Sequence, residues 1–256
     1  MISSYLRTFI LCFFLFLLAC TSEKKETKKK AEVKGKSGKL KSGLVKTYHS
    51  NGNVRAEIMY DSGIKNGLAK DFYEDGVIHH EIEYKRGKKN GLAKMYHKNG
   101  NLFQSTEYLA DEIHGNQTKY REDGKLASIA RYSNGTPCTG LKEYTLDGAL
   151  KKKYPTIVVT PINNLLKDNK YLLRLSMSDK TRAVEYFTGS LTKEGCLGDD
   201  AQKIWTDATN GVVDIVYYLP VGGFIMEKVN IIAKVKTLQG NFYLTQRSYN
   251  VAIENN

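Results

Sequence analysis

Few residues of this chain have types and spacings that could do chemistry. The five histidines do not combine with serine and an acid in any recognised nucleophile motif. His79 and His80 are adjacent in a predicted strand, so we expect them on opposite faces and unable to chelate one metal ion together. Asp199 and Asp200 could bind Ca²⁺, but no further oxygen ligands are evident. With no phosphate loop or dinucleotide fingerprint, the sequence favours a protein that is not an enzyme and has no metal or cofactor.

Cys20 has the clearest chemistry in the chain. It follows an apolar run, Phe9 to Leu18, and the small residue Ala19, behind the single basic residue Arg7. A run this short cannot span a bilayer, which takes about 20 apolar residues, but it is typical of a secretory signal. The segment 17–20, Leu-Leu-Ala-Cys, resembles the bacterial lipobox. That resemblance implies cleavage before Cys20 and acylation of its thiol and new amine, with residues 1–19 as signal peptide; an ordinary signal peptide with a chance cysteine is the alternative.

Two further cysteines would remain outside the cytoplasm after this cleavage. Cys138 and Cys196 form an even pair, and such pairs often become disulfides in an oxidising compartment. Pairing would lock two parts of the chain together. Nothing in the spacing requires the bridge, so paired and free cysteines both remain open.

Residues 20–42 predict a lysine-rich tether. From Thr21 to Ser42 there are nine lysines, three glutamates and almost no large apolar side chain, so we expect disorder. The net charge of this stretch is +6, half of the +12 of the whole chain. The basic character therefore belongs largely to the tether, which argues against nucleic acid as a partner. The tether could contact anionic headgroups beside an acylated cysteine, or it could be a solubilising spacer.

A 24-residue repeat occupies residues 43–154. The repeat is seen in two files, each a series of similar residues 24 positions apart. One file consists of Gly52, Gly76, Gly100, Gly124 and Gly148, and the other consists of Tyr48, Phe72, Tyr96, Tyr120 and Tyr144. A further tyrosine file has the same period and runs through Tyr60, Tyr84, Tyr108 and Tyr132. Internal repeats of this length indicate a stacked, elongated architecture.

The turn residues predict what each repeat is. Asn-Gly or Asp-Gly pairs, such as Asn51-Gly52 and Asp75-Gly76, recur once per repeat and favour type I′ hairpin turns. Alternating apolar and polar residues flank them, which is typical of half-buried strands. We therefore expect an antiparallel meander of about ten strands, with each tyrosine beside its repeat-mate.

The segment 84–102, Tyr-Lys-Arg-Gly-Lys-Lys-Asn-Gly-Leu-Ala-Lys-Met-Tyr-His-Lys-Asn-Gly-Asn-Leu, resembles the MORN repeat in its bacterial variant form. Residues 60–77 match nearly as well, whereas Asp111 stands where Gly63 and Gly87 stand in earlier units. The resemblance implies an elongated, single-layer β-sheet used for binding. Bacterial members are often labelled antitoxin-like, but the fold alone does not give a function.

Residues 155–256 predict a second, different domain. The period stops at Tyr154-Pro155, and six strand-like runs separated by turn residues follow. The spacing favours a β-sandwich with the strand number of an immunoglobulin-like domain, although no Cys…Trp…Cys pattern is present. The chain is thus expected to be all-β throughout its folded part.

These observations favour a non-enzymatic lipoprotein of the bacterial cell envelope, periplasmic or surface-exposed, that binds an envelope protein or a glycan. We expect the Tyr60 file to be buried, because it shares its face with Ile58 and Ile82. The file of Tyr48, Phe72, Tyr96 and Tyr120 shares its face with lysines and is the expected binding surface, unless it only stabilises the sheet. Two alternatives are an antitoxin or immunity-like protein and a cell-wall enzyme with its site in the second domain.

Overall fold

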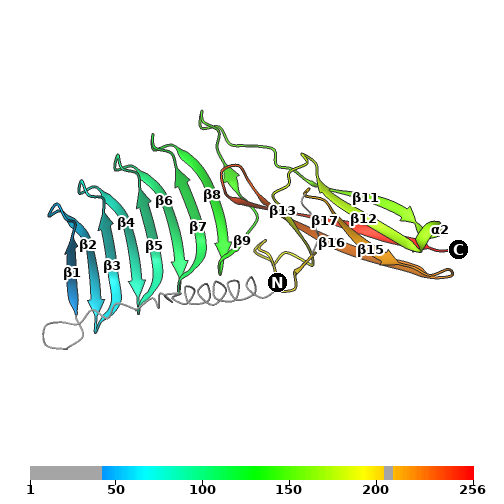
Figure 1. The fold of residues 1–256 in the computed structure, drawn as a ribbon, viewed down its shortest axis with the longest axis horizontal. Helices are drawn as coiled ribbons and strands as arrows, with labels where there is room; N and C mark the ends of the chain where they lie inside the picture. The colour runs from blue at the N-terminus through cyan, green and yellow to red at the C-terminus, as the bar shows by residue number, and fades with distance from the viewer. Residues whose placement is uncertain (1–41, 205–209) are drawn as a thin grey trace, which may run out of the picture.

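The computed structural model describes residues 42–204 and 210–256 of the chain. The predicted signal segment, Cys20 and all of the tether except Ser42 lie outside these residues. The described part is all-β, as predicted: a long antiparallel meander is followed by two smaller sheets, and the meander and the C-terminus lie at opposite ends of an elongated molecule (Figure 1). None of the helices in these two ranges is long and apolar enough to cross a bilayer.

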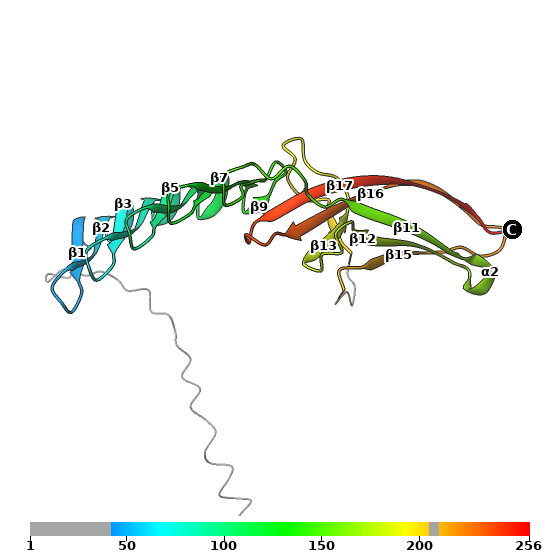
Figure 2. The ribbon, with the colours of Figure 1, turned by 90° about the horizontal axis from the view of Figure 1, so that it is seen from above.

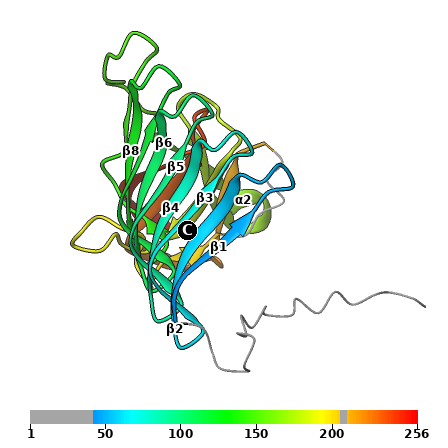
Figure 3. The same ribbon diagram turned by 90° about the vertical axis from the view of Figure 1, so that its left-hand side faces the viewer.

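The meander is a ten-stranded sheet in which sequence neighbours pair. Its strands are β1 (Gly43–Tyr48), β2 (Val54–Asp61), β3 (Ile64–Phe72), β4 (Ile78–Lys85), β5 (Lys88–Tyr96), β6 (Leu102–Leu109), β7 (Glu112–Tyr120), β8 (Leu126–Ser133), β9 (Thr136–Pro137) and β10 (Lys142–Glu143). Seen from the β1 end, the strands fan around one another, which is the twist of an open sheet (Figure 3).

One repeat contributes two strands, so equivalent residues recur on every second strand. The expectation that each tyrosine lies beside its repeat-mate is therefore wrong. Tyr60 on β2 pairs with Lys65 on β3, and Gly67 on β3 pairs with Tyr84 on β4. The Nζ of Lys65 lies 4.8 Å from the centre of the Tyr84 ring, so lysine and tyrosine alternate across the sheet.

The type I′ turns occur at the other end of the strands from the predicted position. Both residues have positive φ at Ser62-Gly63, with 49° and 79°, and again at Ala110-Asp111, with 53° and 81°. At the predicted position Gly52 alone has positive φ, 88°, and its N–H bonds to the carbonyl of His49. That geometry is a three-residue loop whose last residue is a left-handed glycine, an arrangement that Asn-Gly also favours.

A β-bulge follows each of these three-residue loops. Asp71 pairs with His80 while Phe72 pairs with Ile78, so His79 is an extra residue on β4. The equivalent register shift makes Phe103 the extra residue on β6. A bulge breaks the simple alternation of side chains and turns the extra residue toward a new direction.

The two faces of the meander differ in burial. One face, called here the lysine face, carries a cross-strand row of Lys46, Glu57, Lys70, Glu81 and Lys94. The opposite face, called here the docked face, carries the next row, which runs from Thr47 through Asp71 and His80 to Lys119, Ser128 and Glu143. Among the described residues of β1 to β8, the fully buried side chains, those of Ala69, Thr106, Ser128 and Ala130, are on the docked face. This is the face of the Tyr60 file, which the sequence predicts to be the more buried one.

The second domain consists of two sheets packed face to face. The first has the order β11 (Ile157–Asn164), β12 (Lys170–Met177), β15 (Val213–Tyr218), and the second has the order β14 (Gln202–Lys203), β13 (Val184–Thr188), β16 (Phe224–Lys236), β17 (Phe242–Glu254). A four-residue helix, α2 (Leu165–Asp168), joins β11 to β12. Leu173 and Leu175 from the first sheet and Ile231 and Ala233 from the second are completely buried in one core. The predicted β-sandwich is confirmed.

The sandwich touches the meander through its longest hairpin. Strands β16 and β17 extend back to the last repeats (Figure 2), and their turn places Asn241 on the docked face. The Asn241 amide donates to Glu143 Oε1 at 2.9 Å and accepts from Lys119 Nζ at 2.9 Å. Thr237 Oγ1 also donates to Glu143 at 2.5 Å. Because Glu143 and Asn241 are each only 1% exposed, this network fixes the two domains against each other.

Candidate functional site

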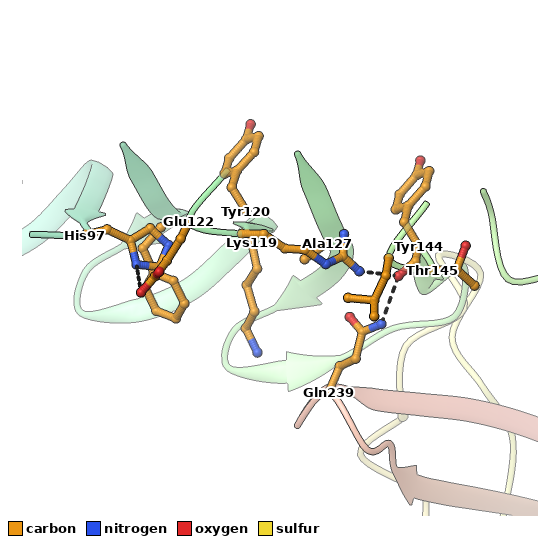
Figure 4. Close-up of a pocket in the computed structure, with 11 residues that line it drawn as sticks. His97, Lys119, Tyr120, Glu122, Ala127, Tyr144, Thr145 and Gln239 are labelled. Atoms are coloured by element: carbon orange, nitrogen blue, oxygen red, sulfur yellow. Dashed lines mark hydrogen bonds and ion pairs between the residues drawn. The ribbon is translucent and has the colours of Figure 1, made fainter. Parts of the chain in front are cut away.

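A groove lies where the last repeats meet the turn between β16 and β17. It is an open groove of about 840 Å³ on the docked face (Figure 4). The loops that follow β5 and β7 form one side, the segment after β10 forms another, and Gln239 of the sandwich closes it. Its principal lining residues are His97, Phe103, Lys119, Arg121, Leu146 and Gln239.

The groove has an apolar floor. The Phe103 ring packs edge-on against His97 with ring centres 4.9 Å apart, and the bulge at Phe103 turns it toward this face. Ala127 occupies the equivalent bulge position one repeat later and also lines the groove. Leu146, at the rim, is 81% exposed. An exposed leucine beside a half-buried aromatic ring favours contact with an apolar group of a ligand.

Cationic groups flank this floor. Burial lowers the pKa of Lys119, and the nearby Glu143 carboxylate partly offsets that effect. Arg121 donates to the carbonyls of Leu126 at 2.8 Å and Tyr144 at 2.6 Å, so it holds the groove wall in place. Aromatic, apolar and cationic groups together suit binding, and the described lining residues supply no nucleophile paired with a base.

Of the four predicted binding residues, Tyr120 lines the groove, whereas Tyr48, Phe72 and Tyr96 are not among its lining residues. All four belong to the file on the lysine face, and Figure 4 shows the Tyr120 ring pointing away from Lys119 and Gln239. Tyr48 on the edge strand is 58% exposed. Tyr96 is tied into the sheet, because its hydroxyl donates to Glu81 Oε2 at 2.8 Å. Burial and this hydrogen bond to a carboxylate raise the pKa of Tyr96 to about 12.

The lysine face is a lattice of paired charges. Lys46 and Glu57 lie 2.6 Å apart, and Glu81 lies 3.1 Å from Lys70 and 3.9 Å from Lys94. Desolvation alone would raise the pKa of Glu81, but hydrogen bonds from Tyr96 and Lys70 outweigh it and lower that pKa. Because these charges are matched within the sheet, this face presents little net charge to a partner.

The structure brings Asp71, His79 and His80 together on the docked face. The Nδ1 atoms of His79 and His80 lie 3.2 Å and 3.0 Å from Asp71 Oδ1, and the two rings are 3.7 Å apart. The expectation that the two histidines point to opposite faces is wrong, because His79 is the extra residue of a bulge. Burial and the neighbouring His80 lower the pKa of His79.

The two remaining predicted residues, Cys138 and Cys196, are joined by a disulfide between the fifth repeat and the sandwich. Beside it, the backbone N–H of Thr139 donates to the carbonyl of Gly195 at 2.8 Å. This contact, the disulfide and the Glu143 network all join the meander to the sandwich. Asp199 and Asp200 lie in an exposed loop of the sandwich, away from the groove lining.

Of the groove residues, sequence reasoning found Tyr120 but missed Phe103, Lys119 and Gln239. Phe103 breaks the two-residue alternation, and the loops that follow β5 and β7 carry His97 and Glu122 in turn positions. The recurring bulge leaves one trace in the 24-residue repeat. The alternation of side chains between the two faces before each turn is out of step with the alternation after it. Gln239 and Lys119 are 120 residues apart, so only the docking of the hairpin could pair them.

Four segments of the chain match the MORN repeat variant: residues 41–62, 65–86, 89–110 and 113–134. These segments cover the part of the meander up to the turn that follows β8, and repeats of this type suggest a binding or scaffold role for the sheet. No curated protein matches the chain.

Proposed function

We propose that this chain is a lipid-anchored, non-enzymatic binding protein of the bacterial cell envelope that holds a partner protein in the groove between its repeats and its sandwich domain. The observation that carries the proposal is the groove itself: Phe103 and Leu146 offer apolar surface beside Lys119 at a rigid junction. The partner would insert an apolar side chain there and present acidic groups to the cationic rim.

Two features of the junction support binding there. The disulfide and the buried Glu143 network fix the two domains against each other, so little ordering is needed when a ligand binds at their junction. On the lysine face, by contrast, the charged groups already satisfy one another. The proposal therefore moves the binding surface from the predicted tyrosine file to the groove.

Attachment to a membrane forms the second half of the proposal. Acylation of Cys20 would anchor the chain, and the segment from Thr21 to Ser42 would separate the sheet from the lipid surface. A Cys20→Ser variant should accumulate with its signal attached and without acyl label. Maturation of this variant to the normal mobility, with continued dependence on detergent for extraction, would show that the lipid anchor is wrong.

Capture from envelope extract tests the binding surface. We expect the double variant Phe103→Ala, Leu146→Ala to lose a partner that the wild-type chain captures, whereas Leu166→Ala should keep it. Leu166 is a matched control because it is 96% exposed on α2, at the far end of the sandwich.

A second pair, Tyr48→Ala with Tyr96→Ala, separates the two faces of the sheet, because neither tyrosine lines the groove. If this pair loses the partner while the groove pair keeps it, binding belongs to the lysine face and the groove proposal is wrong. Circular dichroism of each variant distinguishes loss of the surface from loss of the fold.

A further inference from the structure

Asp71, His79 and His80 form a cluster in which each residue offers one ligand atom. These atoms all lie within 4.8 Å of one another, and no other group of three or more metal-binding side chains with this geometry occurs in residues 42–204 and 210–256. The cluster lies on the docked face, on the second repeat, while the groove is built from later repeats. It is therefore separate from the proposed binding site.

The bulge is what assembles the cluster. Because His79 is inserted between the pairs Asp71–His80 and Phe72–Ile78, both imidazoles face the same carboxylate. The ring of Tyr73 packs against His79 with ring centres 4.3 Å apart, which restricts the imidazole from the side. Ligands placed on paired strands and restricted in this way need little rearrangement.

The spacing of the ligand atoms fits a metal ion. A tetrahedral Zn²⁺ with bonds of about 2.0–2.1 Å separates its ligand atoms by about 3.4 Å. The observed separations between Asp71 Oδ1 and the two Nδ1 atoms are 3.2 Å and 3.0 Å. These two separations are within a few tenths of an ångström of the tetrahedral value, and all three ligand atoms lie within 4.8 Å of one another.

The repeat fold does not require these three residues. One repeat earlier the equivalent positions hold Thr47, Arg55 and Ala56, and one repeat later they hold Met95, Phe103 and Gln104. The same bulge is built in those repeats with quite different side chains. The combination of one carboxylate and two imidazoles is thus a local feature of the second repeat.

We propose that Asp71, His79 and His80 form a binding site for a divalent transition metal ion, with Zn²⁺ as the best fit. Two nitrogen ligands and one oxygen ligand suit zinc and its neighbours and do not suit Ca²⁺ or Mg²⁺, which prefer oxygen. The three side chains are 29–42% exposed, so the fourth position of the ion is open to water or to a ligand atom from a partner.

Calorimetric titration of the metal-free full chain with Zn²⁺, in detergent and without an affinity tag that contains histidine, tests the site. We expect one ion per chain, and we expect bound Co²⁺ to show the visible absorption of a low-coordinate site. Asp71→Asn, His79→Gln and His80→Gln should each weaken binding by at least about 10- to 100-fold, because loss of a hydrogen-bond partner of a metal ligand already costs that much. His114→Gln is the matched control, because His114 lies on β7 of the same sheet and contacts Asn134 instead of a carboxylate.

Melting curves recorded with a chelator present identify a misfolded variant. Without metal, Asp71→Asn, His79→Gln and His80→Gln should each melt like the wild type. Zn²⁺ should raise the melting temperature of the wild type and of His114→Gln. It should leave unchanged the melting temperature of the double variant that carries both His79→Gln and His80→Gln. The proposal is overturned if the wild type binds no Zn²⁺ at millimolar concentration, or if the double variant binds it as tightly as the wild type.

Discussion

Replacing Glu143 by alanine should weaken the junction between the meander and the sandwich. Glu143 accepts hydrogen bonds from Thr237, Asn241 and Lys151, at 2.5, 2.9 and 3.3 Å. The Asn241 amide is 1% exposed, and leaving its N–H group without an acceptor costs about 1–3 kcal/mol. The Lys151 side chain is 42% exposed, so its ion pair adds at most about 1 kcal/mol.

Together these losses predict a decrease of about 3 kcal/mol in the free energy of unfolding. For a folded unit of this size the melting temperature should fall by about 6–12 °C. Urea unfolding followed by circular dichroism measures the change. The same experiment should reveal whether the two domains, once uncoupled, unfold in separate transitions.

Two further variants make the test specific. Glu143→Gln keeps an acceptor for Asn241 and should cost about 1 kcal/mol, since only the charge is lost. Glu122→Ala removes a carboxylate whose side chain is 82% exposed and should change stability by less than about 0.5 kcal/mol. If Glu143→Ala unfolds with the wild type, or if Glu143→Gln is equally damaging, the hydrogen-bond network does not hold the junction.

Ala110→Asn should stabilise the chain by about 0.5–1 kcal/mol in urea unfolding, because Ala110 has φ of 53° in a type I′ turn that asparagine tolerates better; an unchanged midpoint would contradict this turn assignment. The pKa of Glu81 is lowered from 4.5, so its ionised form contributes stability above that pH and loses it as the pH falls through the folded value. Tyr96→Phe removes one of the hydrogen bonds responsible, so the pKa of Glu81 should be lowered less and the variant should lose less stability than the wild type as the pH falls below 4.5; equal losses in the two proteins would exclude the contact. Replacing Cys138 and Cys196 by serine opens a link across 58 residues and should cost up to about 4 kcal/mol; equal stability of this variant and the oxidised wild type would mean that the bridge does not constrain the unfolded chain.

Much of the fold was predictable because the repeat and the strand pattern are local signals. The pair Asn99-Gly100 predicts a left-handed glycine at a hairpin end, and the φ of Gly100 is 84°. The sequence also predicts strands over residues 171–177 and 242–253, and β12 and β17 each differ from these runs by one residue. A strand is recognised by alternating polar and apolar residues that end at turn residues. Both signals involve residues close together in the chain, so they can be read from the sequence alone.

The turn type was not predictable from the residue pair alone. Asn51-Gly52 suits both a two-residue type I′ turn and the end of a three-residue loop, and the pairing of the flanking strands decides between them. The choice has consequences, since the three-residue loop brings the bulge that turns His79 and Phe103 toward the docked face.

The sequence by itself determined the all-β class, the repeat of two strands, the boundary near Tyr154-Pro155 and the two kinds of domain. Tertiary structure alone decided what covers the more buried face of the meander, because the β16–β17 hairpin had to dock before Asn241 could meet Lys119 and Glu143. It also decided the groove and the Asp71–His80 cluster. Side-chain periodicity names residues that share a face, but a bulge changes that periodicity and a distant hairpin selects the face, and both depend on contacts that the local sequence does not contain.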